Sequence, residues 1–144
     1  MTCFIDRVFI LKFPTNGYLS RYGARGDLDL LEITTRVPPS IFKFLSNSAV
    51  QHVKSGTCWN LAQGLGMQVV LTSNCFGKDV AKWRKVHHNK GHGSVFFVYD
   101  SPGNPGYGQC FSPWDYRHKK PEEIKYIPGL TRCADWNVMV YIEM

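Results

Sequence analysis

Apolar residues in this sequence occur in short runs, and glycine, proline and other turn residues separate the runs. The clearest are 94–99 (SVFFVY) and 136–142 (WNVMVYI), which are rich in β-branched and aromatic residues and predict strands. No run approaches the roughly 20 apolar residues that span a bilayer, so we expect no membrane span. With 144 residues, 44% of them hydrophobic, we expect a single domain over 1–144.

The remaining segments predict a mixed fold. Strands are expected at 3–11, 28–37, 67–72, 94–99, about 109–114 and 136–142, and an exposed loop at 18–26. Helices are expected at 40–53, which Ser40 can cap, and over a short run that starts at Thr57. The loop 100–108 would join 94–99 to an antiparallel partner strand. We therefore predict an α+β fold, with a mostly antiparallel sheet and two or three short helices.

Charge and cysteine content narrow the class of protein. Seventeen Lys+Arg against eleven Asp+Glu give a net charge of +6, which suits an anionic partner: a nucleic acid, an anionic lipid, or an acidic inhibitor or immunity protein. The cysteines are Cys3, Cys58, Cys75, Cys110 and Cys133. Their odd number leaves at least one unpaired, and none has zinc-ligand spacing, so we predict neither a metal nor a cofactor.

The same features predict where the protein works. A chain of this size can build its core without disulfides, so we expect mostly reduced, buried thiols with one reactive cysteine. We expect no signal peptide at the start of this sequence, because charged residues interrupt its first apolar stretch. We expect a cytoplasmic protein or one delivered into a target cell.

Cys58 is the candidate nucleophile. At the start of the expected helix, the free N–H groups and the helix dipole would favour its thiolate. Gly56 would let a substrate approach closely, and the Cys58 N–H could face a developing oxyanion. The candidate base is His92, which two glycines flank at the start of the strand 94–99. The expected hairpin would return Asp115 beside His92 to orient the imidazole.

These residues carry a resemblance. A Cys-Trp pair at a helix start, a glycine-flanked His before an apolar strand and a Trp-Asp pair after the next strand resemble papain-like and transglutaminase-like cysteine hydrolases and acyltransferases. The resemblance implies a Cys58–His92–Asp115 triad that acts on a peptide, amide or protein substrate through an acyl-enzyme. Trp59 and Trp114 are further candidate substrate-binding residues, and Gln51 is the nearest upstream candidate for an oxyanion donor. A toxin or effector domain would have this size and charge.

Two other enzyme classes stay open. The basic stretch 78–92 contains His88, Lys90 and His92, which could supply the acid, base and cation of a metal-independent RNase. The rings that could stack bases are Trp83, Tyr107, Trp114 and Tyr116. An NAD-dependent ADP-ribosyltransferase-like toxin would instead use an early arginine and a late glutamate; the candidates are Arg7, Arg21, Arg25 and Glu143.

Overall fold

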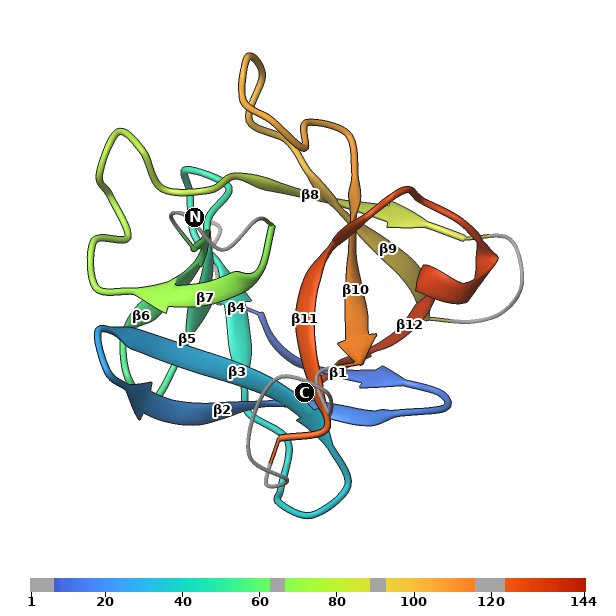
Figure 1. The fold of residues 1–144 in the computed structure, drawn as a ribbon. Coiled ribbons are helices and arrows are strands. Elements are labelled where there is room, and N and C mark those ends of the chain that lie inside the picture. Colours follow the sequence, from blue (N-terminus) through green and yellow to red (C-terminus); the bar gives the residue numbers. More distant parts are fainter. Residues whose placement is uncertain (1–6, 63–66, 89–92, 116–123) are drawn as a thin grey trace, which may run out of the picture.

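The computed structural model describes residues 7–62, 67–88, 93–115 and 124–144 (Figure 1). In these ranges the regular structure is twelve strands and one 3-10 turn, Asp135–Asn137, with no α-helix. The α+β prediction is therefore wrong, because the described fold is all-β. The strands are β1 (Val8–Phe13), β2 (Gly17–Arg25), β3 (Leu28–Thr34), β4 (Phe42–Phe44), β5 (Val50–His52), β6 (Thr57–Leu61), β7 (Val69–Thr72), β8 (Trp83–His87), β9 (Ser94–Tyr99), β10 (Cys110–Asp115), β11 (Tyr126–Thr131) and β12 (Met139–Glu143).

Both expected helices are strands instead. The segment 40–53 forms β4 and β5, whose residues Phe42 and Val50 are fully buried, and a turn with Ser48 at φ 70° reverses the chain between them. The expected helix at Thr57 is β6, whose Thr, Cys and Trp residues lie between β5 and β7. The expected loop 18–26 is most of β2, which pairs with β3. In each case pairing with neighbouring strands outweighed a weak local preference for a helix or a loop.

Most of the predicted strands are confirmed. The strand 94–99 is β9 with the predicted bounds, and the strands expected at 28–37, 67–72, 109–114 and 136–142 overlap β3, β7, β10 and β12. The segment 8–11 lies in β1, and 3–6 lies outside the described residues. Pairing between β9 and β10 is antiparallel as expected, but its register contains only Val98 and Cys110.

Antiparallel pairing closes a barrel. Seven strands form a continuous ring in the order β1-β2-β3-β7-β6-β5-β4, and β4 pairs back with β1 at Phe9–Phe42. The other five strands attach to this ring where β12 pairs with β1. In Figure 1 the first and last strands accordingly lie side by side.

The strand order also repeats three times along the chain. Each third consists of four strands, starting at β1, β5 and β9, and its second and third strands form a hairpin. The first and fourth strands pair in the first and last thirds, as β1 with β4 and β9 with β12. In the middle third, Trp83 N of β8 donates to Ser48 O, in the turn before β5, at 2.9 Å. The three hairpins meet, because β3, β7 and β11 contact one another. Three such units form the arrangement called a β-trefoil.

Aromatic side chains fill the barrel. The second strand of each third contributes a large, fully buried side chain to the core: Leu19, Trp59 and Phe111. The Trp59 ring lies 4.5 Å from Phe111 and 5.3 Å from Phe97, centroid to centroid. Large rings bury much apolar area per residue, so they hold short strands together without helices.

None of the helical structure in the described ranges has the length and hydrophobicity that crossing a membrane would require.

Candidate functional site

Cys58 forms a disulfide with Cys75, and both residues are buried in the structure. Cys58 lies inside β6, so no helix N-terminus acts on its sulfur. A sulfur in a disulfide is neither a thiol nor a thiolate, and the thiolate is the nucleophilic form. A cysteine-hydrolase function would therefore require a reduced form of the protein, and it stays a prediction from the sequence.

A second disulfide joins Cys110, which is buried, to Cys133, which is exposed. The expectation of mostly reduced thiols is wrong for these four cysteines, because strand pairing brings both pairs to Cα separations of 5.4 and 5.0 Å, a distance that disulfides span. Cys3 lies outside the described residues.

The structure brings Gln51 and Gly56 to the Cys58 disulfide. Gln51 pairs with Cys58 across β5 and β6, and its Nε2 donates to Gly56 O at 3.1 Å. This bond closes the turn between the two strands, where Gly56 has φ 75°. Trp59 is fully buried in the core and therefore has no surface to offer a substrate.

Asp115 and Trp114 lie at the end of β10, and His92 lies outside the described residues. β10 pairs along its whole length with β11, where Asp115 opposes Tyr126. The hairpin that was expected to return Asp115 beside the start of β9 is therefore limited to the other end of β10.

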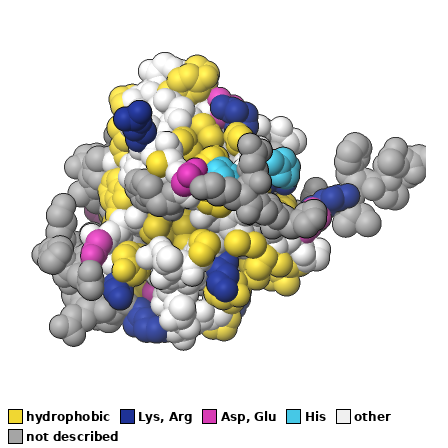
Figure 2. Space-filling model, turned by 90° about the vertical axis from the view of Figure 1, so that its right-hand side faces the viewer, with side chains coloured by type: hydrophobic (Ala, Val, Ile, Leu, Met, Phe, Trp, Pro, Cys, Tyr) yellow, Lys and Arg dark blue, Asp and Glu magenta, His cyan; other side chains and the backbone are white. Residues whose placement is uncertain are grey.

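The RNase candidates divide between described and undescribed residues. His88 contacts Asp135 at 3.3 Å through its Nε2, while Lys90, His92 and Tyr116 lie outside the described ranges. Trp83 is buried, so it cannot stack a base, whereas Tyr107 is 54% exposed. On the face shown in Figure 2, Lys and Arg side chains are scattered among apolar ones instead of forming one continuous patch.

The arginine and glutamate candidates for an ADP-ribosyltransferase are engaged in surface contacts. Pairing of β1 with β12 brings Arg7 to 3.2 Å from Glu143 in an exposed ion pair. Arg21 binds Asp29 through its Nε at 3.0 Å. Arg25 lies over the ring of Tyr22.

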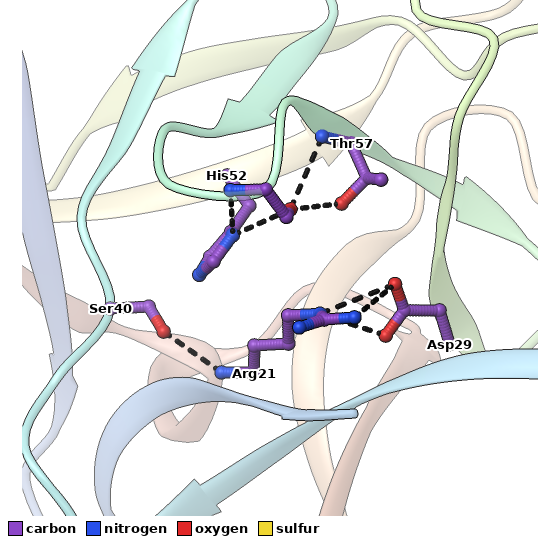
Figure 3. A network of polar contacts seen from close by, with 6 residues as sticks. Arg21, Asp29, Ser40, His52 and Thr57 are labelled. Carbon is purple, nitrogen blue, oxygen red and sulfur yellow. Dashed lines mark hydrogen bonds and ion pairs between the residues drawn. The ribbon is translucent and has the colours of Figure 1, made fainter. Parts of the chain in front are cut away.

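The sequence did not predict one polar network, which is shown in Figure 3. His52 is 5% exposed, and its Nδ1 accepts a hydrogen bond from Ser55 N at 3.2 Å and lies 2.7 Å from Ser55 Oγ, which in turn bonds Thr57. Burial is the main cause of the lowered pKa of His52. The charge of Arg21 lowers this pKa further, and the charge of Asp29 raises it. The neutral imidazole thus fastens the turn between β5 and β6.

A groove of about 660 Å³ is the best candidate for a binding site. Three segments line it. They are the end of the β6–β7 hairpin (Asn60, Leu61, Ala62 and Met67), the segment before β8 (Lys78, Asp79, Val80 and Lys82), and the segment from the end of β9 (Tyr99, Ser101, Pro102, Asn104 and Pro105). Its volume is in the range of ligand pockets.

Two hydrogen bonds, one of them to a side chain, hold two of these segments together. Asp100 N donates to Lys82 O at 2.8 Å, and Lys82 N donates to Ser101 Oγ at 3.1 Å. The Cys58–Cys75 disulfide ties the chain just before Lys78 to β6, where Asn60 lies. The walls are therefore fixed before a ligand arrives, which lowers the entropic cost of binding.

Several polar groups in the groove lack a partner among the described residues. They are the Asn60 amide, the Lys78 ammonium, the Asp79 carboxylate and the Tyr99 hydroxyl. Leu61 and Met67 add apolar surface. No group of three or more His, Cys, Asp or Glu side chains in the described chain could hold a metal ion.

No model of a protein family matches the sequence, and no curated protein matches it either.

Proposed function

We propose that this protein is a non-catalytic binding protein, and that the groove binds a neutral, hydroxyl-rich ligand such as an oligosaccharide. The observation that carries the proposal is the mixture of donors and acceptors in the groove that have no partner among the described residues, which combines Asn60, Lys78, Asp79 and Tyr99. Such a set meets the hydrogen-bonding needs of hydroxyl groups, because each hydroxyl both donates and accepts.

The charges of the groove favour a neutral ligand over an anionic one. Asp79 is next to Lys78 in sequence, and its carboxylate would repel a phosphate that the ammonium attracts. Lys82 is already committed, because its Nζ donates to Asn47 O at 3.1 Å. The apolar surfaces of Leu61 and Met67 can contact the C–H groups of a sugar ring.

The two disulfides support a place of action outside the reducing cytosol. Disulfides persist in oxidising compartments and are rare in cytosolic proteins. Oligosaccharides are displayed on cell surfaces and in cell walls, so the ligand class and the inferred compartment agree.

A titration tests the proposal. The folded, oxidised protein is titrated with a panel of neutral soluble oligosaccharides while backbone amide shifts are followed by NMR. We expect saturable shifts at Asn60, Asp79 and Tyr99 for at least one sugar. Asp79→Asn should weaken that binding by about tenfold or more, because it replaces a charge-assisted hydrogen bond.

Asp27→Asn is the matched control, because Asp27 is exposed in the β2–β3 turn, away from the groove, and the same charge is lost. It should leave the affinity unchanged. Binding that Asp79→Asn and Asp27→Asn affect equally would contradict the assignment to the groove. The same holds if no neutral sugar shifts the groove residues at millimolar concentration.

A further inference from the structure

The outer edge of β8 presents backbone groups that face away from the rest of the sheet. Asp100 N donates to Lys82 O at 2.8 Å, and His88 N donates to Ser94 O at 2.9 Å, both between β8 and β9 or their direct extensions. In an antiparallel pair, hydrogen-bonded residues alternate with residues whose N–H and C=O point outward. The even-numbered residues of β8 therefore face β9, and the odd-numbered ones face outward.

Only the start of this outer edge is occupied in the described part of the chain. Trp83 N donates to Ser48 O at 2.9 Å, which joins β8 to the turn before β5. The next two outward-facing residues, Lys85 and His87, have no backbone hydrogen bond to any described residue, and β8 pairs with no strand except β9. In Figure 1, β8 lies beside β9 as the last strand on this branch of the sheet.

Two cationic side chains, Arg84 and Lys85, lie on β8, and the carboxylate of Asp100 lies beside the first. The Arg84 side chain is 56% exposed and lies 3.8 Å from Asp100, and His87 is exposed. Lys85 Nζ lies 4.0 Å from the centroid of the Tyr141 ring, which holds its charge beside the edge. Like charges on an edge strand oppose its pairing with a second copy of itself. They attract an acidic strand instead.

We propose that β8 binds an extended, acidic peptide segment of a partner protein by strand addition. The peptide backbone would pair with Lys85 and His87, and its carboxylates would approach Arg84 and Lys85. In this mode, main-chain hydrogen bonds supply affinity and alternate side chains supply specificity. The edge of β8 is separate from the residues that line the groove, apart from the adjoining Lys82, so this proposal does not depend on sugar binding.

The experiment uses two matched peptides and the oxidised protein. One peptide is acetyl-Glu-Val-Asp-Thr-Glu-Val-Asp-Thr-amide, and the other has lysine in place of each acid. Affinity is measured by fluorescence anisotropy, and hydrogen exchange of individual amides is measured by NMR. We expect the acidic peptide alone to bind, more weakly as salt increases, and to protect the amides of Lys85 and His87 from exchange.

Charge variants supply the control. Arg84→Gln combined with Lys85→Gln should weaken binding between about 2-fold and 30-fold, the range for two exposed ion pairs. Lys12→Gln is the match for Lys85, because Lys12 also lies over a tyrosine ring, that of Tyr18, but on β1, which is paired on both sides. It should leave the affinity unchanged.

Several results would overturn the proposal. They are the absence of acidic-peptide binding at millimolar concentration, equal binding of the lysine peptide, and binding that leaves the Lys85 and His87 amides unprotected. Protection that rises with protein concentration in the absence of peptide would assign the edge to self-association instead.

Discussion

Removing the Cys58–Cys75 disulfide should destabilise the protein by about 3 kcal/mol or more. The bond closes a loop over a sequence separation of 17 residues, and cross-linking a loop of this length lowers the entropy of the unfolded chain by about 10 cal/mol/K. At room temperature this entropy corresponds to about 3 kcal/mol. In a domain of this size, such a loss should lower Tm by about 10 °C.

The Cys110–Cys133 disulfide provides an internal comparison. It closes a separation of 23 residues, so the entropy argument gives nearly the same value for both bonds. Cys58 and Cys75 are both buried, whereas Cys133 is exposed. Alanine at 58 and 75 leaves a cavity as well, so that double variant should lose more stability than the variant at 110 and 133.

Urea denaturation followed by circular dichroism measures both losses. Iodoacetamide labelling of the native protein, with and without a reductant, establishes which sulfurs are free. A Cys58→Ala/Cys75→Ala variant within 1 kcal/mol of the parent, or alkylation of native Cys58 without reductant, would refute the reasoning. The second result would instead favour the nucleophile that the sequence predicts.

Two further predictions concern single residues. Burial lowers the pKa of His52 below its ordinary value of 6.5. The unfolded chain therefore takes up this proton first, and the free energy of unfolding should fall as the pH decreases below about 6.5 and level off below the folded pKa. His52→Gln should remove this component, and equal slopes of stability against pH from 7 to 5 in both proteins would contradict the assignment. Gly129→Ala should destabilise by about 1–3 kcal/mol, because its Cβ would collide with the indole of Trp114. The cost should shrink in a Trp114→Ala background, and additive losses in urea unfolding would argue against this contact.

The local sequence pattern predicted a strand correctly where a short run consists almost entirely of β-branched and aromatic residues. In the run 94–99, a serine is followed by five β-branched or aromatic residues and then by the Gly/Pro loop, and the predicted bounds are those of β9. The pattern failed over 40–53. Phe42 and Phe44 follow a period of two, but the segment is too short to distinguish that period from a helical one.

The candidate sites could not be predicted from local sequence patterns, because they depend on contacts between distant segments. Cys58 was singled out for a helix dipole that does not exist, since cross-strand neighbours place it in β6 opposite Gln51. The groove was not predicted, because Asn60, Asp79 and Tyr99 come from three segments far apart in the chain. None of these residues forms a motif with its sequence neighbours.

The sequence by itself determined a series of short apolar segments, an excess of positive charge and a set of five cysteines. These features depend only on residue types and on neighbours in the sequence, so composition and periodicity reveal them. Only the tertiary structure decided which strands are neighbours, which cysteines meet, and which polar groups line the groove. Those outcomes depend on contacts between residues far apart in the chain, and such contacts are set by packing the aromatic core and satisfying backbone hydrogen bonds.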